Sequence, residues 1–283
     1  MLQFRSVAAI VAVFATAVSG FATASMAQSP ADLVRNAARA TLTPVDHSTW
    51  NKLLKAYVKP GQDGLNRVDY GAFKKSGHAA LKMYVAGLEK VDPAKLDRRD
   101  QFAFFANLYN AKTIEIVLDH YPVKSIKDIS IGGGLFAAFT GGPWKAKVLR
   151  IKGMELSLDD IEHEILRPVF KDPRVHYAVN CASIGCPNLG TEAFTGGTLE
   201  AQLDAGARAY INHPRGVTVS RGQVTASSIY SWFKADFGGS DKGVLSHMRK
   251  YASPELAEAL SRAGSISKHA YDWRLNDTRG GQS

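Results

Sequence analysis

The chain lacks the features that would tie it to a lipid bilayer or to a nucleic acid. The apolar run from Val7 to about Val18 is too short to span a bilayer, and no later segment is apolar for long enough to cross a membrane. Its 35 lysines and arginines exceed its 26 acidic residues, giving a net charge of +9, but no run of five or more basic residues occurs. We therefore expect no later transmembrane segment and no nucleic-acid partner.

Common motifs for phosphate, cofactor and metal binding are also absent. Glycines at 132–134 and 141–142 bracket a loop, but they match neither G-x-G-x-x-G nor the spacing of a phosphate-binding loop. Zinc accepts histidine and thiolate ligands, yet His163, His176 and the cysteines fit no compact zinc-ligand spacing. We expect no cofactor and no bound metal, and leave a metal site as a minor alternative.

The N-terminal residues have the pattern of a secretory signal peptide. Arg5 supplies the positive charge, the apolar run follows, and small residues around Ala27 form a cleavage pattern. No cysteine stands directly after this site, which argues against a lipoprotein anchor. We expect residues 1–27 to be removed after Ala27 and the mature chain to be periplasmic or secreted; an uncleaved anchor is the alternative.

One helix is predicted more strongly than any other. It should run from Asp100, as its N-cap, to His120, and its apolar residues cover most of its circumference. A helix that is apolar on all sides is surrounded by the rest of its domain. We expect this helix to lie at the centre of the fold.

Apolar periodicity elsewhere predicts shorter helices and strands. Helices are expected near 47–58, 70–88, 157–166, 194–210, 230–237 and 244–251. Strands or extended segments are expected near 65–70, 144–151, 175–180, 217–226 (a hairpin) and 271–276. With no repeat and no linker, these elements predict one α+β domain over 49–277. A segment 28–48 precedes it, and a disordered tail 278–283 follows.

Both cysteines of the chain lie in one short segment that also holds a histidine. Alternation along 175–180 would place His176 and Asn180 on one face of a strand, with Cys181 where the strand ends. A thiol needs a base or a cation nearby to become a thiolate at neutral pH. We therefore expect Cys181 to be a nucleophile, with Cys186 as the alternate and His176 as the base.

Other polar residues are candidates for supporting roles. His163 is a second candidate base, and either Glu162 or Asp272 would orient the imidazole. Asn180, Ser183 and the amides of the turn 182–185 would donate hydrogen bonds to an oxyanion.

Asn107 and Asn110 share one face of the central helix, because they lie three residues apart. Two interpretations remain open for them. Either they line a substrate-binding site, or they tie the helix to neighbouring backbone, since buried amides need partners.

The two cysteines also allow three chemistries other than nucleophilic catalysis. An exported protein with two cysteines usually pairs them, so a structural Cys181–Cys186 disulfide is the main alternative. The domain would then bind a peptide or a glycan around His176 without turnover. A redox-active pair is a further alternative, although the spacing differs from Cys-x-x-Cys.

Several segments resemble the family called domain of unknown function 547. They are 105–111, 120–126, 158–163, 175–187 and 271–276, and the most specific is Asn180-Cys-Ala-Ser-Ile-Gly-Cys-Pro187. The resemblance runs from about Trp50 to Asn276. It implies a papain-like or transglutaminase-like α+β fold, with a central helix packed on an antiparallel sheet. In transglutaminase-like enzymes the nucleophilic cysteine opens the central helix, whereas here both cysteines follow His176.

These observations predict a thiol-dependent hydrolase or acyl transferase that acts on an amide or thioester bond. Its partner would be a peptide, a protein or a glycan of unknown identity. The alternative is a non-catalytic binding or scaffold domain with a disulfide between Cys181 and Cys186.

Overall fold

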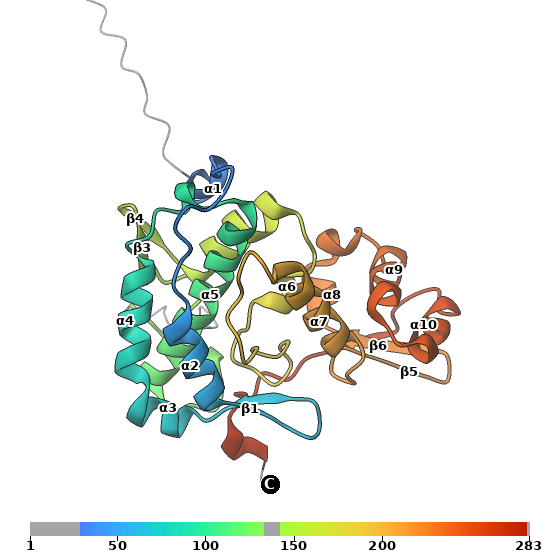
Figure 1. Ribbon diagram of the computed structural model, residues 1–283. Helices are drawn as coiled ribbons and strands as arrows, with labels where there is room; N and C mark the ends of the chain where they lie inside the picture. Colours follow the sequence, from blue (N-terminus) through green and yellow to red (C-terminus); the bar gives the residue numbers. More distant parts are fainter. Residues whose placement is uncertain (1–28, 133–141, 282–283) are drawn as a thin grey trace, which may run out of the picture.

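One long helix, α5 (Arg98–His120), organises the larger part of the molecule (Figure 1). The structure, a computed structural model, describes residues 29–132 and 142–281. The predicted signal peptide and most of the glycine loop lie outside these ranges. The predicted central helix is confirmed, but its N-cap is Asp97 and not Asp100. The Asp97 carboxylate accepts hydrogen bonds from the amides of Arg99 and Asp100, both at 3.0 Å.

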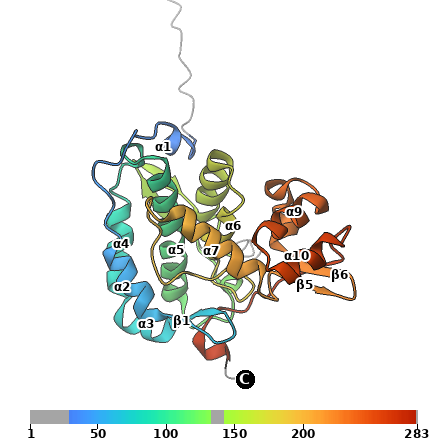
Figure 2. The same cartoon turned by 45° about the vertical axis from the view of Figure 1, so that its right-hand side comes forward.

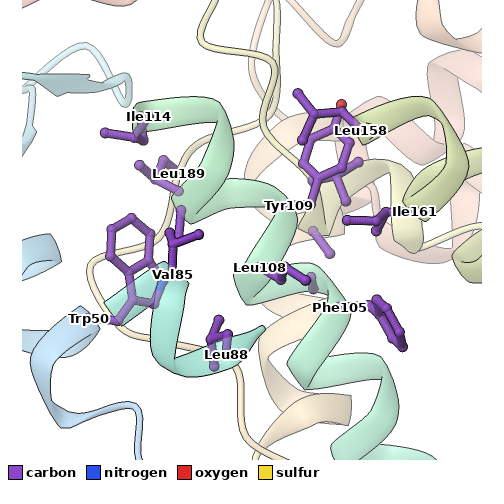
Figure 3. Packing of buried hydrophobic residues seen from close by; sticks show 14 of the residues in the cluster. Trp50, Val85, Leu88, Phe105, Leu108, Tyr109, Ile114, Leu158, Ile161 and Leu189 are labelled. Carbon is purple, nitrogen blue, oxygen red and sulfur yellow. The ribbon is translucent and has the colours of Figure 1, made fainter. Parts of the chain in front are cut away.

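Helix α5 is buried on all sides by other helices. Its main neighbours are α3 (Tyr70–Ser76), α4 (His78–Leu88) and η4 (Asp160–Phe170). Figure 3 shows Val85 and Leu88 of α4 on one side of α5, and Leu158 and Ile161 on the other. The chain is thus a mixed α and β protein, but the expectation that its central helix packs on an antiparallel sheet is wrong.

The elements around this core are short. Helices α1 (Asp32–Arg35) and α2 (Ser48–Tyr57) precede two antiparallel strand pairs. These pairs are β1 (Val58–Pro60) with β2 (Asn66–Val68), and β3 (Leu149–Ile151) with β4 (Met154–Leu156). The remaining short helices here are η1 (Pro93–Lys95) and η2 (Ile126–Asp128). The helix predicted over 70–88 is divided at Gly77 into α3 and α4.

Helix η4 carries two of the predicted site residues and has π-type geometry. Its start follows the predicted capping pattern, because Ser157 and Asp160 exchange hydrogen bonds between side chain and backbone at 2.6 and 3.1 Å. The helix was expected to end near Leu166, but it continues to Phe170 with Pro168 inside it. Across the residues that the structure describes, no helix has both the length and the apolarity to span a bilayer.

A second hydrophobic cluster lies beside the first (Figure 2). It is built by α7 (Leu199–Ile211), α9 (Asp241–Tyr251), α10 (Pro254–Ser261) and a three-stranded sheet. In this sheet β6 (Gln223–Ser227) pairs antiparallel with β5 (Val217–Ser220) and parallel with β7 (Lys268–Ala270). The predicted hairpin over 217–226 is therefore confirmed. The predicted helix 230–237 is instead two short ones, α8 (Ile229–Trp232) and η5 (Lys234–Phe237).

The strand predicted over 175–180 is wrong. Residues 175–178 form a short helix, α6 (Val175–Ala178), and the backbone becomes extended only at Val179. All four residues of α6 are buried, with Tyr177 in the second cluster and Val175 and Ala178 in the first. Because these residues are buried on every side, their sequence is a short apolar run. A run this short does not distinguish a buried helix from a buried strand.

The C-terminal segment returns from the second cluster to the first. Residues 271–276 are extended as predicted, and Leu275 pairs with Ser183 in an isolated antiparallel bridge. Hydrogen bonds from Tyr70 to Asn276 and from Tyr121 to Asp277, both 2.7 Å, hold the end of this segment. The tail was expected to be disordered from 278, but residues Thr278–Gly281 form a short 3-10 helix, η6.

Candidate active site

The two cysteines lie side by side in a tight loop after α6. Their Sγ atoms are 3.0 Å apart, and both are free thiols in this structure. Cys181 is partly exposed, whereas Cys186 is buried and 3% exposed. The two thiols therefore share a site but differ in access to solvent.

The loop conformation is held by its own side chains. The Asn180 amide donates to the carbonyl of Pro187 at 2.6 Å, and its oxygen accepts from the backbone of Ala182 at 2.8 Å. Ala182 has a φ of +58°, a left-handed conformation that costs energy for any residue other than glycine. Gly185 is required by close approach, because a Cβ there would lie 2.7 Å from the amide nitrogen of Asp272. Strain and packing thus fix the position of Cys181.

Cys181 is surrounded by hydrogen-bond donors. Its Sγ lies 3.0 Å from the Tyr271 hydroxyl and 3.4 Å from the Ser183 hydroxyl. Hydrogen bonding from the Cys186 thiol, and then from these hydroxyls, lowers the pKa of Cys181 against the opposing effect of burial. Burial raises the pKa of Cys186 well above its usual value, and the neighbouring Cys181 raises it further. Cys181 is therefore the more acidic thiol of the pair.

His176 is buried between an aspartate and an aromatic ring. Its Nε2 lies 2.7 Å from Oδ2 of Asp236, and its ring stacks on Phe233 at a centroid distance of 4.3 Å. Burial lowers the pKa of His176, although the hydrogen bond to Asp236 opposes this. Burial would raise the pKa of Asp236, but hydrogen bonds from His176 and Arg167 hold it well below its usual range. The result is a neutral imidazole at pH 7, oriented by an ionised carboxylate.

Glu162 lies near the imidazole and lines the same cavity as the thiol. Its Oε1 is 3.9 Å from Nδ1 of His176, and its negative charge raises the pKa of Cys181. Burial raises the pKa of Glu162 itself, and a hydrogen bond with Tyr109 partly offsets this. A buried carboxyl group with a raised pKa is a candidate proton donor and acceptor near neutral pH.

These side chains line one cavity of about 160 Å³ between the two hydrophobic clusters. Its acidic and basic lining groups are Asp159, Glu162, His163 and His176, and both thiols open onto it. Three of the four tryptophans of the chain lie in its aromatic wall, which consists of Tyr109, Trp144, Trp232, Phe233, Tyr271 and Trp273. The cavity therefore joins a reactive thiol to a mostly aromatic surface.

The structure brings His163 to the cavity but places Asp272 elsewhere. His163 accepts a hydrogen bond from Arg167 at its Nδ1, 3.0 Å away, and its Nε2 is 3.7 Å from Asp159. The Asp272 carboxylate is bound by Arg274 and does not line the cavity. The geometry thus favours Asp236 over Asp272 as the residue that orients an imidazole.

Three asparagines were expected to bind substrate, but their side-chain amides form hydrogen bonds with backbone groups. Asn107 exchanges two hydrogen bonds with the backbone of Phe194, at 2.8 and 2.9 Å. Asn110 donates to the carbonyl of Ala178 and accepts from the amide of Asn180, both at 2.8 Å. With the bonds of Asn180 described above, this geometry matches the structural alternative.

Oxyanion donors are fewer than the sequence suggested. The amides of Ala182, Ile184, Gly185 and Cys186 all bond to protein acceptors. The Ser183 hydroxyl lies beside Cys181 and remains a candidate donor. The Tyr271 hydroxyl, 2.9 Å from the Ser183 hydroxyl, is a second one. In the described ranges, no cluster of three or more histidine, cysteine or acidic side chains could hold a metal ion.

Sequence reasoning missed Asp236, Tyr271 and the tryptophan wall. Asp236 follows His176 by 60 residues and sits in an ordinary amphipathic stretch, so no local pattern marks it. Tyr271 follows Cys181 by 90 residues, yet it belongs to the segment 271–276 that carried part of the family resemblance. That resemblance was the one signal that could have found it.

Comparison with known proteins supports the resemblance. Residues 93–211 match the model of a family described as "Protein of unknown function, DUF547". No curated protein and no solved structure matches the chain. The matched range includes α5, η4, α6 and the cysteine loop, which together supply most of the cavity's reactive groups. Residues 93–211 of the chain thus carry the region that defines the domain of unknown function 547 family.

Proposed function

We propose that the protein is a thiol-dependent hydrolase or acyl transferase that acts on an amide or thioester bond. Cys181 is the nucleophile in this proposal. The observation that carries it is the placement of the Cys181 thiol, beside the Tyr271 hydroxyl, in the same cavity as Glu162 and His176, whose imidazole is hydrogen-bonded to Asp236. A nucleophile, a base and a residue that orients the base are the parts that covalent acyl transfer requires.

The first step would be attack of the Cys181 thiolate on the substrate carbonyl carbon. A carbon–sulfur bond forms, and the carbonyl π electrons move to oxygen. The hydroxyls of Tyr271 and Ser183 lie beside the sulfur and are suited to donate to that oxyanion. Collapse expels the amine or thiol, and water or an acceptor amine then releases the acyl group from Cys181.

Proton transfer would run through Glu162 and His176. Because Asp236 accepts the hydrogen of Nε2, Nδ1 of His176 is the acceptor, and it faces Glu162. The proton lost by Cys181 passes to this pair, and the leaving group takes it back. General acid–base catalysis favours a pKa close to the working pH, and burial raises the pKa of Glu162 in that direction.

The test uses a chromogenic aryl thioester and an aryl amide, with intact-mass detection of the acylated enzyme. The wild-type protein should show turnover and acyl mass on Cys181, and Cys181→Ala should show neither. Asp236→Asn should lower kcat at least about tenfold. The matched control Asp272→Asn, which disturbs only the ion pair with Arg274, should change kcat little. Full turnover by Cys181→Ala would overturn the proposal, as would equal effects of the two aspartate variants.

A papain-like or transglutaminase-like relationship is part of this proposal. The combination of Cys181, His176 and Asp236 supports it, while the position of the cysteine after the histidine is a permuted order. Export is also proposed, from the sequence pattern that ends at Ala27. N-terminal sequencing of protein from the host cell should begin at Gln28; an intact Met1 would contradict export by cleavage.

A further inference from the structure

The proposed acyl-transfer chemistry uses Cys181 and leaves Cys186 with no chemical step. Yet the buried Cys186 sulfur lies 3.0 Å from that of Cys181, close enough for a bond to form with a shift of about 1 Å. Both thiols line the cavity, but Cys181 is partly exposed whereas Cys186 is buried. In dithiol oxidoreductases an accessible thiol attacks and a shielded neighbour resolves, so this arrangement has a second use.

We propose that Cys181 and Cys186 form a redox-active dithiol that reduces small, uncharged organic disulfides entering the cavity. This activity goes beyond the proposed acyl transfer and does not depend on it. Trp232, which is 49% exposed, lines the cavity, and the volume of about 160 Å³ admits a small molecule rather than a folded protein. The carboxylates of Asp159 and Glu162 disfavour an anionic disulfide there.

The reaction balances without any further reagent. The Cys181 thiolate attacks one sulfur of the disulfide, a new sulfur–sulfur bond forms, and the first substrate thiolate leaves and takes up a proton. Cys186 then loses its proton and attacks the Cys181 sulfur. The second substrate thiolate leaves and takes up that proton. The substrate gains two electrons and two protons, and the protein is oxidised to a Cys181–Cys186 disulfide.

The second attack requires a Cys186 thiolate, and two features of the structure favour one. The backbone N–H of Cys181 donates to the Cys186 sulfur at 3.0 Å. Behind the loop, Arg215 donates to the carbonyl of Ile184 at 3.2 Å and to Asn188 at 2.7 Å. Its Nε is buried without a partner in the described part of the chain, and no carboxylate there forms an ion pair with it.

Arg215 is partly buried, and its guanidinium packs over the Tyr210 ring at 5.4 Å from the ring centroid. Burial lowers the pKa of Arg215, and negative charge on Tyr210 or Cys186 raises it. By reciprocity, the guanidinium stabilises a thiolate at Cys186. Arg215 is therefore a positioning residue for the resolving step and does not contact the substrate disulfide.

The experiment mixes reduced protein with hydroxyethyl disulfide and follows intact mass after acid quench. Wild type should lose two hydrogens, with at most a transient adduct. Cys186→Ser should stop at a stable adduct of one hydroxyethylthio group on Cys181. Cys181→Ser should not react on the same timescale. A stable adduct on wild-type protein, or equal reaction of both single variants, would overturn the proposal.

Two charge variants test the resolving step separately. Arg215→Met should slow conversion of the adduct to the internal disulfide by about tenfold for each pKa unit that Cys186 gains. Arg215→Lys keeps the charge and should retain most of the rate. Equal closure rates in both variants would remove Arg215 from the mechanism. If the wild-type protein reduces the disulfide but does not turn over the thioester, only the acyl-transfer proposal is refuted. The two proposals can therefore fail independently.

Discussion

At the scale of single residues, the acidity of Cys181 depends on short contacts that oppose one another. Hydroxyls and the Cys186 thiol stabilise the thiolate, while burial and the charge of Glu162 destabilise it. Cys186 and Ser183 belong to the cysteine loop itself, whereas Tyr271 and Glu162 come from other segments of the chain. Two substitutions with opposite expected signs test this balance.

Tyr271→Phe should raise the pKa of Cys181. The substitution removes a donor 3.0 Å from the sulfur, and one hydrogen bond to a charged group corresponds to about one pKa unit. The pH dependence of iodoacetamide labelling at Cys181 measures the shift. Tyr230→Phe is the matched control, because the Tyr230 hydroxyl contacts that of Tyr177 and not the thiol. An unchanged labelling midpoint in Tyr271→Phe would show that this contact does not stabilise the thiolate.

Glu162→Gln should lower the pKa of Cys181, because it removes a nearby negative charge at constant shape. Labelling of Cys181 should become faster at pH values where Glu162 is ionised in the wild-type protein. Thioester turnover should fall at the same time, since the proton relay is lost. Slower labelling in this variant would contradict the assigned direction.

At the scale of elements, side-chain amides on α5 hold the cysteine loop in place. Asn110 bonds to backbone on both sides of Val179, between α6 and Cys181. Asp236 of η5 bonds to Arg167 of η4 and to His176 of α6, so one carboxylate links three elements. The geometry of the candidate site therefore depends on side chains that hold the loop and the imidazole in place from neighbouring elements.

Asn110→Ala should lower the free energy of unfolding by about 2–6 kcal/mol. It leaves the buried carbonyl of Ala178 and the amide of Asn180 without partners, at about 1–3 kcal/mol each. Urea unfolding measures the loss. Labelling of the buried Cys186 should also become faster, because the loop loosens. Asn107→Ala is the control: it leaves the Phe194 backbone without partners and should destabilise the protein without exposing Cys186. Equally fast labelling of Cys186 in both variants would contradict the specific role of Asn110.

At the scale of the whole molecule, the cavity lies where two hydrophobic clusters meet. Tyr109 and Val179 belong to the cluster around α5, whereas Ile229 belongs to the cluster around the three-stranded sheet. Pockets concentrate at such junctions because neither side fills the space between them. The C-terminal segment crosses this junction, and it brings Tyr271 and Trp273 to the cysteines.

The protein should lose stability as the pH falls below about 6.5, in part through His247. Burial lowers the pKa of His247 from 6.5 to about 4, so the folded state binds fewer protons than the unfolded state. Its contribution is complete above pH 6.5 and is lost between that pH and about 4. The shift corresponds to a loss on the order of 3 kcal/mol.

Urea unfolding at pH 7 and pH 4.5 measures this effect. His247→Gln should reduce the difference between the two pH values relative to wild type. His120→Gln, at an exposed position at the end of α5, is the control and should retain the wild-type difference. A wild-type pH dependence in His247→Gln would contradict the assignment.

The sequence by itself determined the central helix, the hairpin, the family resemblance and the segment that holds both cysteines. Those features are local: apolar periodicity specifies a helix buried on all sides, and the block around Cys181 and Cys186 is contiguous. The sequence pattern failed at α6, where burial on every side gave a strand-like run to a helical turn.

Only the tertiary structure decided which groups act together. Asp236 reaches His176, Tyr271 reaches Cys181, and three tryptophans from separate segments form one wall. It also decided that Asn107, Asn110 and Asn180 support backbone and that one thiol is exposed while the other is buried. The physical reason is that hydrogen-bond partners, burial and the pKa values they set depend on distances in space, which the order of residues along the chain does not contain.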